Sequence, residues 1–141
     1  MKSQFALRES LRSTSDFGKN NDAYMNTITT VIGILVALEH LFIMFLETIA
    51  TGSKSTSRLF GISVDQLKSK TIATLLKNQG VYNGLIAVLL LVAVWQQDLL
   101  WTRLILGYVV LVALYGSITS KPNIILKQGG LAILGLICSF I

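Results

Sequence analysis

Four apolar runs separated by short polar segments constrain the fold of this chain more than any other feature of its sequence. They cover residues 28–50, 81–95, 99–118 and 124–141. The runs exceed the roughly 4 to 8 residues of a buried strand and lack strict alternation, which favours helices. Hydrocarbon offers the backbone no hydrogen-bonding partner, so apolar runs of this length are best satisfied as helices. The pattern predicts an all-α membrane protein, an antiparallel four-helix transmembrane bundle.

The connections between the runs differ in length. Residues 51–77 are mainly polar, but five apolar residues among them are expected to form a short amphipathic piece at the membrane interface: Val64, Leu67, Ile72, Leu75 and Leu76. The connections around residues 96–98 and 121–123 are tight turns, so sequential helices are expected to pack antiparallel. The second run is short for a span unless its helix begins upstream, near Leu75.

Composition agrees with a membrane protein. Hydrophobic residues make up 52% of the 141 residues and charged residues only 13%, too little polar surface for a soluble domain of this size. The single cysteine, Cys138, excludes an intramolecular disulfide. No basic patch with interleaved aromatics appears, so the net charge of +5 does not indicate nucleic-acid binding. The expected partner is the lipid bilayer, and no cofactor is expected.

The basic residues predict an orientation. The first connection carries five, the third carries Lys121 and the nearby Lys127, and the second offers only Arg103, which is expected to snorkel to the interface. The positive-inside bias places connections one and three in the cytoplasm and both termini outside. Residues 1–24 add four basic residues to the side predicted to be outside, which opposes this orientation. These residues lack the apolar core of a signal peptide. We interpret residues 1–24 as a disordered tail or an upstream-start extension, and residues 25–141 as the membrane domain.

Three ionisable residues, Glu39, His40 and Glu47, interrupt the first apolar run. Each costs roughly 2.5 to 3.5 kcal/mol inside a membrane, and such residues usually face a protein interior or an aqueous cavity. On a helix the three fit a wedge of roughly 100°. They either bind a polar ligand, relay protons or assist catalysis, or only satisfy partners on other helices, with Glu47 near the headgroups. A metal site is not predicted, because His40 and Glu47 differ by about 10 Å of helical rise and no second histidine exists.

A second polar cluster, NQGVYNG, occupies residues 78–84 at the start of the second run. Gly80 and Gly84 form a GxxxG pair, which predicts close helix packing. The amides beside them are expected to meet the carboxylates of the first run, although packing alone also explains the motif. We predict a polar ligand pocket built from Glu39, His40, Glu47, Asn78, Gln79, Tyr82, Asn83, Tyr115 and Gln128.

These motifs carry a family resemblance. The chain has EH and a second Glu in the first run, then NQGVYNG, ALYGSITS, and KQGG followed by LAILGL. Over residues 25–141 it resembles a family of small bacterial four-helix membrane proteins known as a domain of unknown function, number thirteen-zero-four. Members of that family often have proline after the QG pair, where this chain has Gly130 and Leu131, so the local helix geometry is expected to differ. The resemblance implies an integral protein of the bacterial cell membrane and no established activity.

Three functions remain open from the sequence. The first is binding or transport of a small polar or amphipathic ligand, where transport would require a homodimer or larger homo-oligomer because four helices make a narrow bundle. The second is an enzyme acting on a lipid or quinone-like substrate, with Glu39 or His40 as acid or base. No nucleophile–base pair, phosphate loop or cofactor motif supports it. The third is an accessory or structural subunit. Convergence of Glu39, His40 and Asn83 on an open cavity favours the first two, and separate pairing favours the third.

Overall fold

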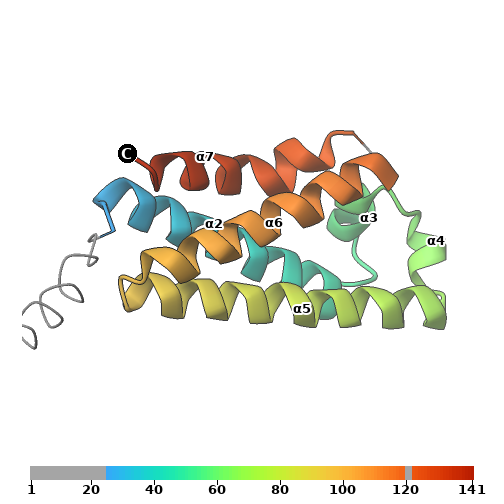
Figure 1. Cartoon of the computed structure of the whole chain (residues 1–141). Helices are drawn as coiled ribbons and strands as arrows, with labels where there is room; N and C mark the ends of the chain where they lie inside the picture. Colours follow the sequence, from blue (N-terminus) through green and yellow to red (C-terminus); the bar gives the residue numbers. More distant parts are fainter. Residues whose placement is uncertain (1–24, 120–121) are drawn as a thin grey trace, which may run out of the picture.

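Helices account for all the regular structure in the residues that the computed structural model describes, 25–119 and 122–141 (Figure 1). The expected N-terminal extension, residues 1–24, lies outside the described residues. In chain order the elements are α2 (Thr27–Thr48), α3 (Lys54–Phe60), α4 (Val64–Leu67), α5 (Lys70–Trp95), α6 (Leu99–Thr119), the π-helical segment η1 (Ile125–Gly129) and α7 (Gly130–Cys138). The prediction of an all-helical protein is confirmed.

Three helices are long and apolar enough to cross a membrane: α2 with 22 residues, α5 with 26 and α6 with 21. A hydrocarbon core about 30 Å thick needs about 20 helical residues, so each of the three has sufficient length. The fourth apolar run forms a shorter helix, Ile125–Cys138, in which η1 continues into α7. Membrane-length helices are therefore established for three of the four predicted runs, and the fourth span stays a prediction.

Helix α5 begins at Lys70, eleven residues before the second apolar run, because no proline or glycine interrupts residues 70–79. The predicted single amphipathic piece is wrong in one respect, since its residues are divided between α4 and α5. The division falls at Ser69, which has an extended backbone (φ −62°, ψ 126°) and is the N-cap residue of α5. Two short helices, α3 and α4, thus precede α5 and lie at one end of the molecule (Figure 1).

Local capping fixes these two short helices. The Ser53 hydroxyl accepts a hydrogen bond from the Thr56 N–H (3.1 Å) at the start of α3. Helix α3 is followed by its C-cap residue Gly61, whose φ of 68° is the left-handed conformation that glycine adopts readily. Ser63 and Gln66 form a capping box at the start of α4. The Thr56 hydroxyl also donates to the Ala50 carbonyl (2.7 Å), so α3 is held against the end of α2.

Glycines allow α2 and α5 to approach closely. A Cβ atom at Gly80 would lie 2.6 Å from Thr48 Oγ1 and 3.0 Å from Glu47 Cβ, and one at Gly84 would overlap the Met44 sulfur. At Gly80 a larger residue would therefore press on α2 itself, including the Met44 carbonyl oxygen, whereas at Gly84 the Met44 side chain would have to move. Helix α2 also contacts α7, where a Cβ at Gly135 would lie 2.9 Å from Ile32 Cγ2. Helix α2 consequently packs between α5 and α7.

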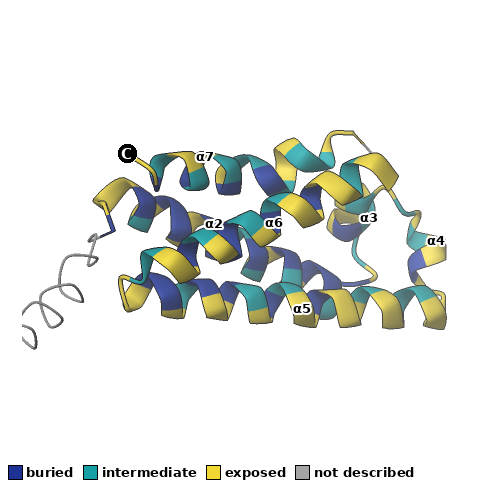
Figure 2. Ribbon diagram, in the orientation of Figure 1, coloured by how far each residue is buried: buried dark blue, intermediate teal, exposed yellow. Residues whose placement is uncertain are grey.

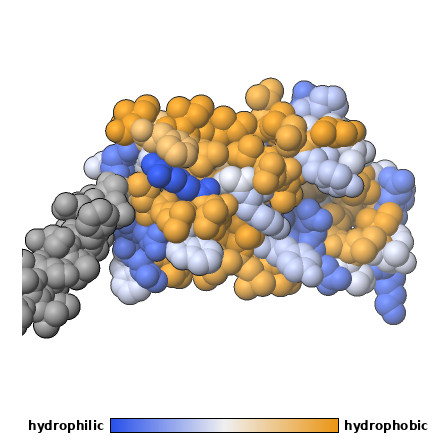
Figure 3. All heavy atoms as spheres, in the orientation of Figure 1, coloured by the Kyte–Doolittle hydropathy of each residue, from blue (hydrophilic) through white to orange (hydrophobic). Residues whose placement is uncertain are grey.

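Small and aliphatic side chains fill the interior, while large apolar side chains cover much of the outside. Buried and exposed residues alternate along the long helices (Figure 2). The apolar residues that are fully buried are Val36 and Ala37 of α2, Ala87 and Leu90 of α5, Leu106 of α6, and Ala132 of α7. Exposed apolar residues include Leu38, Phe42, Leu85, Val88, Leu104, Leu111 and Leu134. Figure 3 shows hydrophobic residues across most of the middle of one face, with hydrophilic residues mainly toward the two ends. This distribution is typical of a surface in contact with hydrocarbon rather than water.

The end of α7 is fixed by contacts from two other helices. Arg103 of α6 donates from Nε to Ser139 Oγ (3.1 Å) and from Nη2 to the Ser139 carbonyl, and its guanidinium lies 4.1 Å from the centre of the Phe140 ring. Asn26, the N-cap residue of α2, donates from Nδ2 to the Cys138 carbonyl (2.9 Å). Arg103 therefore folds onto the chain terminus, because bidentate and ring contacts are available there, instead of only reaching the interface as expected.

Candidate functional site

The nine residues of the predicted pocket do not surround a single space. Six of them line one or both of two cavities, Glu47 contacts Asn83, and the remaining two point outward. The first cavity has a volume of about 250 Å³ and is called the His40 cavity here. It is lined by His40, Gln79, Tyr82, Asn83, Ile86, Tyr108, Val109, Val112, Ala113 and Gln128. Five of the nine predicted residues, contributed by α2, α5 and η1, therefore surround one space.

His40 presents one nitrogen atom for further bonding. It is 6% exposed, and its Nδ1 donates a hydrogen bond to the Val36 carbonyl one turn earlier in α2 (2.9 Å). A carbonyl only accepts, so Nδ1 carries the proton, and in the neutral ring Nε2 is left as an acceptor. The structure shows no hydrogen bond to Nε2 from the described residues. The imidazole is thus oriented by its own helix and has a free acceptor beside the cavity.

The expected contact between the amides of the second run and the carboxylates of the first is present at one pair. Asn83 Nδ2 donates to Glu47 Oε2 at 2.7 Å. Gly80 and Gly84 are three residues before and one after Asn83, on the side of α5 that meets α2, so they place Asn83 opposite Glu47. Glu47 is only 2% exposed, so its side chain is buried where α2 meets α5. It does not line the His40 cavity but supports it by holding Asn83.

Gln128 reaches the site from a π-helical turn. The segment η1 covers Ile125–Gly129 and ends directly before Gly130, where α7 begins. The Ile125 N–H donates to Ser117 Oγ (2.7 Å), and Ser117 in turn donates to the Ala113 carbonyl (2.9 Å). Short π-helical turns inside helices occur often at functional sites. This one turns Gln128 into the space between α2, α5 and α6.

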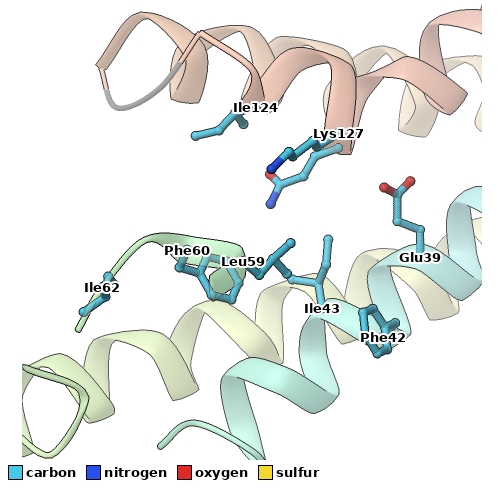
Figure 4. A pocket seen from close by; sticks show the side chains of 9 residues that line it. Glu39, Phe42, Ile43, Leu59, Phe60, Ile62, Ile124 and Lys127 are labelled. Carbon is cyan, nitrogen blue, oxygen red and sulfur yellow. The ribbon is translucent and has the colours of Figure 1, made fainter. Parts of the chain in front are cut away.

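Glu39 lies in a second cavity, called the Glu39 cavity here, with a volume of about 360 Å³ (Figure 4). It is lined by Glu39, Phe42, Ile43, Leu59, Phe60, Ile62, Ile124, Lys127 and Gln128. Gln128 is the residue that both cavities share. Glu39 and His40 are adjacent and point about 100° apart on α2, which explains why one predicted pocket is two spaces.

Besides Glu47, two predicted residues, Asn78 and Tyr115, line neither cavity. Both are exposed, Tyr115 to 70%. Each is two residues from a buried neighbour, Gly80 or Ala113, and so lies about 200° round its helix from the packed face.

Two polar lining residues, Tyr108 and Lys127, were not among the predicted pocket residues. Both carry polar groups inside apolar runs, which is the signal that identified Glu39 and His40. Within the described ranges, no group of three or more His, Cys, Asp or Glu side chains is placed to hold a metal ion.

The described part of the chain is thus an all-helical protein with three helices of membrane length and two cavities that polar side chains partly line. It belongs to the family described as "Protein of unknown function (DUF1304)", whose model matches residues 34–140 and so includes both cavities. The resemblance seen in the sequence is confirmed.

A relative in the bacterium Lactococcus lactis subsp. lactis (strain IL1403), "Uncharacterized protein YpaA", is 52% identical over 118 residues, which is 82% of this chain and 99% of the relative. No solved structure matches the chain.

Proposed function

We propose that this protein is an integral membrane protein that binds, or helps to move, a small polar ligand in the His40 cavity. The observation that carries the proposal is the convergence of polar side chains from three elements on one space. His40 comes from α2, Gln79 and Asn83 from α5, and Gln128 from η1. Polar groups inside membrane helices are costly, and among these four side chains only Asn83 is hydrogen-bonded to another described side chain, so their gathering around a cavity favours a ligand site.

The lining of the cavity supports an uncharged ligand. It includes no Asp, Glu, Lys or Arg side chain, but it offers the His40 Nε2 acceptor, amide donors and acceptors, and the hydroxyls of Tyr82 and Tyr108. The remaining walls are apolar and are formed by Ile86, Val109, Val112 and Ala113. A volume of about 250 Å³ fits a molecule smaller than a typical drug. A compact molecule with several hydroxyl, carbonyl or amide groups and one apolar side meets these conditions.

The same proposal includes a fourth span and an orientation. The segment formed by η1 and α7 covers about 21 Å at 1.5 Å per residue, and the residues flanking it at 122–124 and 139–141 would complete the crossing. Its packing against Ile32 of α2 and Leu106 of α6 supports an antiparallel four-helix transmembrane bundle. The positive-inside bias supports a bacterial cell membrane location with both termini outside and connections one and three in the cytoplasm.

One observation favours the alternative of an accessory or structural subunit. Glu47 is buried and paired with Asn83, so this carboxylate needs no ligand. If His40 and Gln128 are likewise satisfied within the assembled protein, the polar residues only fix helix register and partner choice. The two functions differ in whether the cavity holds a molecule.

Native mass spectrometry of the purified full chain with its co-purified small molecules tests the proposal. The variants are His40→Leu and Gln79→Ala, with Asn78→Ala as the matched control, because Asn78 is adjacent to Gln79 but outside the cavity. We expect a bound species that falls about tenfold in the two cavity variants, since each leaves a hydrogen-bonding group of the ligand unpaired. An unchanged set of bound molecules in both would refute the proposal and favour the subunit.

A further inference from the structure

The Glu39 cavity holds a carboxylate and an ammonium group that do not pair with each other. Glu39 Oε2 is shielded from solvent and has no hydrogen-bond partner among the described residues. Within the described ranges the one ion pair is Lys68–Asp65, on the surface. The Lys127 ammonium nitrogen is therefore more than 4.0 Å from the carboxylate oxygens of Glu39. Figure 4 shows Glu39 rising from α2 and Lys127 on the opposite wall, on the segment that contains η1.

The unpaired carboxylate oxygen is costly where it lies. Glu39 is in the middle of α2, nine residues before its end at Thr48, which is about 14 Å along the helix. A carboxylate at such a depth costs several kcal/mol unless a hydrogen-bond donor or a cation satisfies it. The cavity beside Glu39 provides the room for such a partner.

The rest of the cavity wall is apolar. Phe42 and Ile43 extend from α2, one turn beyond Glu39, and Leu59 and Phe60 come from α3, with Ile62 directly after it (Figure 4). The hydrogen bonds of Thr56 to the Leu46 and Ala50 carbonyls hold α3 in this position. An occupant would therefore meet a negative group, a positive group and an apolar surface in one space of about 360 Å³.

We propose that the Glu39 cavity binds an amphipathic zwitterion whose primary ammonium group contacts Glu39, whose anionic group contacts Lys127, and whose apolar part lies on Phe42, Leu59 and Phe60. A primary ammonium donates hydrogen bonds to a carboxylate, whereas a quaternary ammonium has no N–H to donate. Phosphoethanolamine carries this pair of charges, both as a lipid headgroup and as a free molecule. The apolar wall favours the lipid-borne form.

Lipid retention tests the proposal with defined probes. The full chain is reconstituted in nanodiscs with equal amounts of phosphatidylethanolamine, phosphatidylcholine and phosphatidylglycerol, then extracted, and its bound lipids are measured by native mass spectrometry. We expect phosphatidylethanolamine to be enriched over both other lipids. Glu39→Gln and Lys127→Gln should each lower this enrichment about tenfold, the effect of losing one charge-assisted hydrogen bond.

Matched controls separate the site from general charge effects. Asp65→Asn and Lys54→Gln remove one surface charge of each sign outside the cavity and should leave the enrichment as in the unmodified protein. A second arm adds soluble phosphoethanolamine. If soluble phosphoethanolamine displaces the lipid, the free zwitterion is enough for binding. If it does not displace the lipid, binding requires the lipid-borne form. Both results support the site.

Equal retention of the three lipids, or the same enrichment in Glu39→Gln, overturns the proposal. If Glu39→Gln fails to fold, a photocrosslinking residue at Leu59 tests the same wall without changing either charge. Adducts with phosphatidylethanolamine in excess over phosphatidylcholine are expected there, and equal adducts refute the site. Glu39 and Lys127 do not line the His40 cavity, so the two proposals can fail separately.

Discussion

Asn83 and Glu47 join α5 to α2 through a hydrogen bond of 2.7 Å between an amide donor and a nearly fully buried carboxylate. Replacing Asn83 with alanine leaves that carboxylate without its donor. We expect the Asn83→Ala variant to lose about 1–3 kcal/mol of unfolding free energy, measured by denaturant titration in detergent micelles. Asn78→Ala, on the exposed side of the same helix, is the control and should change little. Equal stability of the two variants would show that the bond contributes nothing net.

The close approach at Gly80 predicts a helix-packing defect on substitution. An added methyl group would lie 2.6 Å from Thr48 Oγ1 and 3.2 Å from the Met44 carbonyl oxygen, so Gly80→Ala should push α2 from α5 and cost about 1–3 kcal/mol. Gly107→Ala is the matched control, because a Cβ there meets open space, and its stability should be unchanged or slightly raised. Thermal unfolding followed by circular dichroism distinguishes the two. A tolerated Gly80→Ala would contradict the packing described here.

The contacts of Arg103 predict that its replacement by lysine, which keeps the charge, lowers stability. Lysine keeps the charge but lacks the planar fork that bonds both Ser139 oxygens and stacks on Phe140. Arg103→Lys should therefore loosen the end of α7, with a loss of about 1.5–3 kcal/mol and faster carboxypeptidase digestion. Arg58→Lys, on the exposed surface of α3, controls for the change of residue type. Identical digestion rates would show that the terminal contacts do not fix the chain end.

Cysteine labelling tests the proposed orientation. In a Cys138→Ser background, a cysteine at Ser55 in the first connection should react with a membrane-impermeant maleimide only after the cells are opened. A cysteine at Gln96, exposed at the second connection, should react in intact cells. The reverse pattern would invert the orientation, and labelling of both from one side would mean that α5 does not cross the membrane.

The sequence predicted the contact between α2 and α5 well, because its signals are local. The spacing of Gly80 and Gly84 places them on one face, and the amide of Asn83 lies on that same face by helical geometry alone. The residues of this interface therefore do not depend on how the other helices pack.

The division of the pocket was not predictable in the same way. Glu39 and His40 are adjacent in the sequence and point about 100° apart on α2, but the position of η1, whose Gln128 lines both cavities, does not follow from that geometry. That position depends on a π-helical turn and on the bond between Ile125 and Ser117, neither of which has a clear sequence pattern. From the sequence, Lys127 contributes only to the positive-inside bias. Nothing near it in the sequence shows that it faces Glu39.

Gln128 forms part of the wall between the two cavities. Its side chain ends in one acceptor oxygen and one donor nitrogen, so when the oxygen faces one occupant the nitrogen is left for the other. A rotation of this single amide would exchange the two roles. Occupancy of one cavity would then change which ligand atoms the other prefers, and the π-helical turn would serve as the point where the two chambers communicate.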